Sequence, residues 1–183
     1  MSVSKWKLVD IPHEQDTLTW ATQGDYHWLY TNTPLNVSME ASPLLIDVSE
    51  PREGAMPEQI VHAPTFQTRA SSDVFIAHLR SLVIMRSPAD KPVTVRFYVP
   101  TYLTFWLSKL PIPRQETLMG CIEHIQWQGH QLSLPDDAQS VKRFEVNTTL
   151  GWFALDEQEW ALLKDAYQNR NSHPEQSRPQ ATT

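Results

Sequence analysis

The chain of 183 residues is long enough for one domain with an appendage, and the 40% of its residues that are hydrophobic can supply a core. Its net charge is −6, with 15 Lys and Arg against 21 Asp and Glu. This balance argues against nucleic acid and against anionic membrane surfaces as partners, because both bind clustered cations. The single cysteine excludes a disulfide within the chain and suits a reducing compartment.

Residues 1–24 are mixed in pattern and largely polar. Trp6, Leu8, Val9 and Ile11 fit either a short strand or the surface of the core, so this segment is predicted to be part of the domain or loosely attached to it. No apolar run follows the first lysines, as a secretory signal would require. No stretch reaches the ~18 apolar residues of a membrane span. We therefore expect a cytoplasmic protein without a membrane partner.

Two strands are predicted next. Tyr26 to Tyr30 forms the first and ends at turn-forming residues, and Ser42 to Val48 forms the second. The uninterrupted Leu44-Leu45-Ile46 predicts that the second strand is buried on both faces. Gln59 to Thr68 is also strand-like, but Pro64 points to an edge, a bulge or two short pieces.

The stretch from Ser71 to Leu110 predicts a helix, a turn, a strand and a second helix. The first helix is capped by residues 71–73 and runs to a stop signal at Ser87-Pro88. Its apolar face consists of Phe75, Leu79, Leu82 and Val83. An alternating strand from Val93 to Tyr98 follows, and Thr101 caps the second helix. The apolar stripe of that helix consists of Leu103, Trp106, Leu107 and Leu110.

Shorter elements are predicted after Leu110. Residues 115–119 form a short helix ended by Gly120, and Cys121 to Trp127 forms a strand. Gln128-Gly129-His130 then turns the chain into a hairpin with residues 131–134. Residues 142–147 predict a last short strand.

A final helix is predicted from Asp156 to Tyr167, where Asp156 and Glu159 have capping-box spacing. Its inner face is predicted to be Trp160, Leu163 and Tyr167. Residues 169–183 are polar and nearly free of apolar side chains, which predicts a disordered tail. The predicted fold class is α/β, with α+β as the alternative: a single domain over residues 25–168, built on a small mixed β-sheet with packed helices.

No catalytic constellation emerges from the sequence. The seven histidines lack the local spacing of a zinc site, and five glycines make a nucleotide-binding loop hard to build. His78 is interpreted as a structural histidine on a helix, and Cys121, beside Met119 and Ile122, as an inert buried thiol. We therefore predict no catalytic, cofactor-binding or metal-binding residues and no enzymatic activity.

Arg96 is the polar residue with the least obvious place, because it lies between Val95 and Phe97 in the most apolar part of the chain. It lies either on an exposed strand face, with its aliphatic stem on a neighbour, or inward and paired with a carboxylate such as Asp47. The alternation of the strand fits both interpretations.

The order of these segments resembles that of a bacterial type VI secretion adaptor family, effector chaperones long known only as a domain of unknown function. The motifs that carry the resemblance are Pro43-Leu44-Leu45-Ile46, residues 78–82, Arg96 to Leu103, and Gly120 with Trp127. They span residues 26–167. Val99 stands where the family's third motif has Asp before proline.

The resemblance implies a non-enzymatic adaptor domain that binds and stabilises a cognate secreted effector protein and helps to load it on the VgrG spike. The candidate partner-binding residues, at the strand-to-helix junction, are Arg96, Tyr98, Tyr102, Phe105 and Trp106. Trp106 falls on the apolar stripe and fits a core position, whereas Phe105 falls outside it. The alternatives are an immunity protein that binds a toxin and a small hydrolase whose site residues are dispersed in the sequence.

Overall fold

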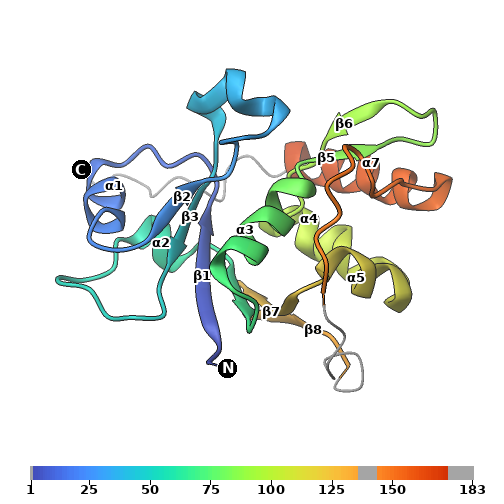
Figure 1. Cartoon of the computed structure of the whole chain (residues 1–183). Helices are drawn as coiled ribbons and strands as arrows, with labels where there is room; N and C mark the ends of the chain where they lie inside the picture. Colours follow the sequence, from blue (N-terminus) through green and yellow to red (C-terminus); the bar gives the residue numbers. More distant parts are fainter. Residues whose placement is uncertain (1, 136–143, 173–183) are drawn as a thin grey trace.

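A computed structural model describes residues 2–135 and 144–172 of the chain. Its centre is a six-stranded sheet with the order β2-β3-β1-β4-β7-β8 (Figure 1). These strands are β1 (Ser4–Val9), β2 (Tyr26–Trp28), β3 (Leu44–Asp47), β4 (Thr65–Thr68), β7 (Ile122–Trp127) and β8 (His130–Ser133). A second sheet pairs β5 (Ile84–Arg86) with β6 (Pro92–Thr94). The predicted α/β class is confirmed, but the five strand pairings of the large sheet are all antiparallel, whereas a mixed sheet was predicted.

The N-terminal segment supplies the central strand of the large sheet. β1 pairs with β3 on one side, where Leu8 lies opposite Leu45, and with β4 on the other, where Trp6 lies opposite Phe66. The side chains of Trp6 and Leu8 are buried. Of the two alternatives predicted for residues 1–24, the structure therefore supports a segment that is part of the domain.

Helices cover both faces of the large sheet, because the strands bury side chains in both directions. Trp6, Leu8 and Leu45 face the main core, together with α3 (Ser72–Ser81). Val9, Leu44 and Ile46 face a smaller core under α1 (Gln15–Ala21) and α2 (Glu58–Val61). Figure 1 shows α1 and α2 on one side of the sheet and α3, α4 and α5 on the other. The predicted burial of β3 on both faces is confirmed.

The central stretch differs from the prediction in two respects. α3 is capped as expected, since the Val74 N–H donates to the Ser71 hydroxyl at 3.4 Å, but it ends at Ser81. Residues 84–86 form β5 instead, and β5 pairs with β6, so the predicted strand from Val93 to Tyr98 is wrong beyond residue 94. The apolar period continued past the end of the helix because β5 is buried as well.

The second predicted helix begins earlier than expected and is broken into pieces. α4 (Pro100–Phe105) has Val99 at its N-cap position with no side-chain cap, so Thr101 is not the cap. Val99 is buried, whereas an Asp at this position could accept an orphan backbone N–H. A short 3₁₀ helix, η2 (Leu107–Lys109), and α5 (Ile112–Met119) follow.

Several short segments also have clear outcomes. Gln128 and Gly129 both have positive φ and form a two-residue turn between β7 and β8, so the predicted hairpin is present but His130 belongs to β8 and not to the turn. Residues 59–68 split into α2 and β4, so only their second half is a strand. A 3₁₀ helix, η1 (Pro34–Ala41), joins β2 to β3. Residues 144–147 are not a strand, and the rest of that predicted element, 142–143, lies outside the described residues.

The last helix, α7 (Glu157–Ser172), is longer than predicted and faces the core differently. Its helical residues include 169–172, the start of the predicted tail, while 173–183 lie outside the described residues. Glu159 and Ala166 are buried, Trp160 and Leu163 pack at the edge of the core, and Tyr167 is 57% exposed. The predicted inner face is therefore wrong for Tyr167. None of the helices in the described ranges has the length and apolar character needed to cross a membrane.

Candidate functional site

The described side chains include neither a cluster of metal ligands nor an activated cysteine, and the Ser133 hydroxyl, which lies 2.6 Å from His124 Nδ1, belongs to an exposed pair on β8 and β7. Within residues 2–135 and 144–172, no three His, Cys, Asp or Glu side chains converge as metal ligands would. Cys121 is partly buried, and this desolvation raises the pKa of its thiol to about 12, although a hydrogen bond with Thr68 opposes the shift. Because the thiolate is the nucleophile, this cysteine is poorly suited to catalysis at neutral pH.

His78 on α3 occupies a structural position. Its Nε2 lies 2.8 Å from the Leu118 carbonyl oxygen, and because a carbonyl only accepts, Nε2 carries a proton and donates it. The ring packs edge-on against Phe144, with centroids 4.8 Å apart. Burial lowers the pKa of His78 to about 4, since desolvation disfavours the charged imidazolium. The interpretation of His78 as a structural histidine fits this environment.

Two of the five predicted partner-binding residues lie in the core. Trp106 is fully buried, and its indole N–H donates to the Glu159 carbonyl oxygen at 3.1 Å. Tyr98 is buried as well, with its ring edge-on to Phe97. Neither side chain can reach a partner in this conformation, so both act through the packing of the domain.

Arg96 lies in the irregular segment between β6 and α4, and its side chain is 20% exposed. Its guanidinium forms an ion pair with Asp10, from the loop after β1. The inward, paired interpretation of Arg96 therefore fits, but the partner is Asp10 rather than the suggested Asp47. Asp47 accepts a hydrogen bond from the Ser49 N–H instead. Asp10 is 86 residues away in the sequence.

Tyr102 and Phe105, both on α4, lie on opposite sides of α7. Tyr102 is largely buried, and its remaining surface lines a groove beside α7. Phe105 is 37% exposed, with the Lys109 ammonium 5.7 Å from its ring centroid. Phe105 faces a smaller depression that Leu162 and Asp165 also line. The expectation that Phe105 is more exposed than Trp106 is confirmed.

This groove is mostly apolar and has a volume of about 620 Å³. One wall is the segment 93–96 with Tyr102, and the other is α7. We call it the α7 groove. Its apolar lining consists of Val93, Val95, Tyr102, Trp160, Leu163 and Tyr167. The three α7 residues in this lining follow the i, i+3, i+7 spacing of one helix face, which explains how they form a continuous stripe.

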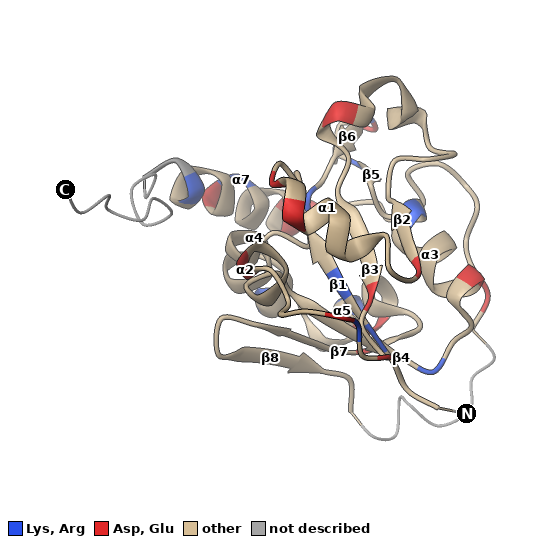
Figure 2. Cartoon of the chain, turned by 90° about the vertical axis from the view of Figure 1, so that its left-hand side faces the viewer, with Lys and Arg blue, Asp and Glu red and all other residues tan. Residues whose placement is uncertain are grey.

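Cations border the α7 groove. Arg96, Lys164 and Arg170 belong to its lining, and no Asp or Glu among the described residues does. Arg96 is neutralised by Asp10, whereas Lys164 and Arg170 are exposed and form no ion pair within the described ranges. In Figure 2 the last turns of α7 extend beyond the neighbouring elements and carry a red stretch followed by a blue one. The groove is thus locally positive on a chain whose net charge is −6.

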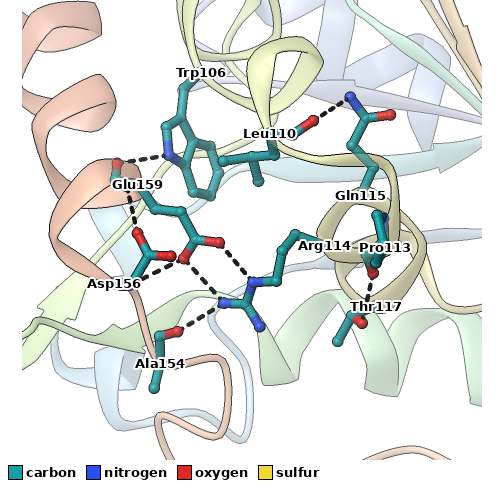
Figure 3. A network of polar contacts seen from close by, with 9 residues as sticks. All are labelled: Trp106, Leu110, Pro113, Arg114, Gln115, Thr117, Ala154, Asp156 and Glu159. Carbon is teal, nitrogen blue, oxygen red and sulfur yellow. Dashed lines mark hydrogen bonds and ion pairs between the residues drawn. The ribbon is translucent and has the colours of Figure 1, made fainter.

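A buried polar network fixes the start of α7 and with it one wall of the groove (Figure 3). The Arg114 guanidinium, from α5, donates to both carboxylate oxygens of Glu159, at 2.6 and 3.0 Å, and to the Ala154 carbonyl oxygen at 2.7 Å. The same guanidinium lies 4.2 Å from the Phe153 ring centroid. Such a bidentate pair has a defined geometry, which orients the helix as well as attracting it.

The predicted capping box is part of the same network. The Glu159 N–H donates to Asp156 Oδ1 at 2.8 Å, and the Asp156 N–H donates to Glu159 Oε2 at 3.1 Å. Glu159 is only 2% exposed, so these partners supply the hydrogen bonds that its carboxylate oxygens would otherwise make with water. We call Arg114, Asp156, Glu159 and Trp106 the α7 anchor.

The spacing of apolar residues on the last helix indicates an apolar face, but this face was predicted to be buried in the core and not to line a groove. Trp160, Leu163 and Tyr167 have the spacing of a buried face, and apolar spacing alone does not distinguish a core from a half-exposed groove. Two of the predicted residues, Arg96 and Tyr102, do line the groove. Lys164 and Arg170 were not predicted, because lone cations on a helix are ordinary surface residues.

A family model described as a domain of unknown function, DUF4123, matches residues 7–116, which is more than half of the chain. The chain belongs to the DUF4123 family. The matched DUF4123 region begins within β1, contains β2 to β6 with α1 to α4, and ends within α5, so it includes the 93–102 wall of the α7 groove. The α7 wall lies outside the match. No curated protein and no solved structure matches the chain.

Proposed function

We propose that this DUF4123 protein is a non-enzymatic adaptor of the type VI secretion system. It binds a cognate effector in the cytoplasm, keeps it soluble and helps to load it on the VgrG spike. The resemblance of the sequence motifs to the adaptor family supports this function. The DUF4123 match covers the same region as most of those motifs.

The observation that carries the proposal is the composition of the α7 groove. Aromatic and aliphatic side chains line it, with cations at the border, and His, Cys, Ser, Asp and Glu do not occur among its described lining residues. A hydrolase needs a nucleophile activated by a base within reach of its substrate, and neither the Thr94 hydroxyl nor the Lys164 amine of the lining has a hydrogen bond or ion pair to such a base among the described residues. Half-exposed aromatic side chains and Arg are instead typical of protein interfaces. The groove therefore favours a protein-binding function over the hydrolase alternative.

The test is to purify the tagged, full-length chain from its native bacterium and to identify what co-purifies by mass spectrometry. The adaptor function predicts one large effector in near-stoichiometric amount, with or without VgrG. Limited proteolysis of the complex then maps the bound fragment. Binding to a delivery region supports an adaptor, whereas binding to the toxic catalytic domain indicates the immunity protein. A chain that purifies alone refutes both.

A further inference from the structure

The α7 groove has properties that restrict what can bind in it. The stripe from Trp160 to Tyr167 spans eight residues of helix, and the seven rises of 1.5 Å between them give a length of about 10 Å. This length corresponds to about two helical turns of a partner. Tyr167 at its end is more than half exposed, although the groove places it beside Trp160 and Leu163.

The other wall offers little to an added strand. β6 has three residues and begins with Pro92, which has no N–H to donate. Proline at an edge is also one of the features by which sheets prevent strand addition. An extended peptide would therefore find few backbone partners there. A helix, which satisfies its own backbone and presents side chains at i, i+3, i+4 and i+7, suits a groove built from side chains.

The cations at the border of the groove determine which charges a bound helix should carry beside its apolar face. Lys164 and Arg170 are exposed and without an ion pair in the described ranges, and the groove lining contains no described carboxylate. At 100° per residue the two cations lie on opposite flanks of the stripe, with Lys164 beside its middle and Arg170 about 4.5 Å beyond Tyr167 along the helix. Carboxylates on the ligand would complement both cations, and the same border would repel a basic peptide.

We propose that the α7 groove binds a short amphipathic helix of the effector, whose apolar face carries two or three large side chains and whose flanks carry Asp or Glu. This inference rests on the proposed adaptor function and names the kind of segment that the adaptor recognises. The apolar side chains of the ligand contact Trp160, Leu163 and Val95, and its carboxylates pair with Lys164 and Arg170. The α7 wall, which lies outside the DUF4123 match, then sets the charge preference of this particular chain.

The first test uses site-specific photo-crosslinking in the native bacterium. Replacing Tyr167 with p-benzoylphenylalanine keeps an aromatic side chain in the groove, and irradiation links it to whatever lies there. The expected product is a crosslink to a segment of the effector that has apolar residues at helical spacing and a net negative charge. The matched control places the same crosslinker at Val37, which is 88% exposed on η1 and does not line the groove.

Each other outcome overturns the inference in a distinguishable way. If an effector co-purifies but crosslinks only from position 37, the adaptor function stands and the groove is not its binding site. A crosslink to a basic or an extended segment refutes the chemistry proposed for the ligand. A crosslink to residues 173–183 of the same chain, or to a second copy, shows that the protein itself occupies the groove. If no effector co-purifies with any form, the proposed function fails as well.

The second test measures the charge preference with a synthetic peptide of the crosslinked segment. Lys164→Glu with Arg170→Glu should weaken its Kd on the order of tenfold or more, since two attractions become repulsions. The matched control, Lys5→Glu with Lys109→Glu, changes the net charge equally at exposed positions outside the groove. An equal or larger loss in the control refutes the proposal. Raising NaCl from about 0.05 M to about 0.5 M should weaken native binding and affect the reversed variant far less.

Discussion

The buried imidazole of His78 predicts a specific pH dependence of stability. Burial lowers its pKa from 6.5 to about 4, so the unfolded chain binds a proton at a pH where the folded chain does not. Stability contributed by the neutral ring is therefore present above about pH 6.5 and is lost as the pH falls toward 4. Each unit of difference between the two pKa values is worth about 1.4 kcal/mol, so the total loss of stability is roughly 3 kcal/mol. About half of it falls between pH 6.5 and 5.

The variant His78→Gln isolates this effect, because its amide N–H₂ can still donate to the Leu118 carbonyl oxygen but does not titrate. Urea unfolding, followed by tryptophan fluorescence, gives the free energy of unfolding of both proteins at several pH values. At pH 6.5 the variant should be less stable than the native chain, because a glutamine side chain packs less well in the space of the imidazole ring. As the pH falls to 5, the difference should shrink by about 1.5 kcal/mol, since only the native chain has a histidine to protonate.

The reasoning is refuted if the difference between the two proteins stays constant, to within about 0.5 kcal/mol, over that range. His62→Gln, at an exposed position, is the control for loss of a histidine as such. A direct check is the NMR titration of the His78 ring in the folded protein. Its resonances should remain those of a neutral imidazole at pH 5.

Three further predictions concern single side chains. Gly120 has φ +56, and a Cβ there would lie 2.5 Å from the Phe144 ring and 2.8 Å from the His78 ring. Gly120→Ala should therefore lower the free energy of unfolding, measured in urea, by at least about 2 kcal/mol. An unchanged free energy of unfolding would contradict this close packing. Arg114→Ala leaves the buried Glu159 carboxylate without its cation and should lower the free energy of unfolding by about 3 kcal/mol. The double variant Arg114→Ala with Glu159→Gln should recover part of this loss, because no unpaired charge stays buried. If the double variant is less stable than the single one, the unpaired carboxylate is not the cause of the loss. The Arg52 guanidinium donates to four carbonyl oxygens, from α1, from β3 and from the chain between them. Lysine has a single ammonium in place of this fork of donors, so Arg52→Lys should lower the free energy of unfolding by about 2 kcal/mol. An unchanged urea midpoint would show that water can replace these hydrogen bonds.

Features that depend on a few neighbouring residues were predictable from the sequence. The Ser71 cap and the Asp156–Glu159 capping box have the expected geometry, and the hairpin expected around Gln128-Gly129 is present. In each case the partner atoms lie within about four residues, and the local chemistry allows one favourable arrangement. The apolar run of β3 was equally informative, because a strand without polar residues has no face suited to water.

Features that depend on distant partners were not predictable in this way. The ion pair of Arg96 with Asp10 joins residues 86 positions apart, and that of Arg114 with Glu159 joins residues 45 apart. Glutamate is ordinarily a surface residue, and Glu159 is tolerated on the buried side of α7 because the Arg114 guanidinium pairs with its carboxylate. Periodicity located the helix correctly but gave no information on which neighbours cover each face. The same limitation led to the groove-lining residues being interpreted as an inner face.

The arrangement of α7 separates the residues that hold the helix from the residues that face the groove. Arg114, Trp106 and Glu159 fix its first turn through buried hydrogen bonds, while Lys164, Tyr167 and Arg170 are exposed further along the helix. Exposed side chains away from caps and ion pairs contribute little to stability. Substitutions at the three groove positions can therefore change the charge and shape presented to a partner while the fold stays intact. If the groove is the binding site, replacing these three side chains should change which partner this chain prefers while its free energy of unfolding stays the same.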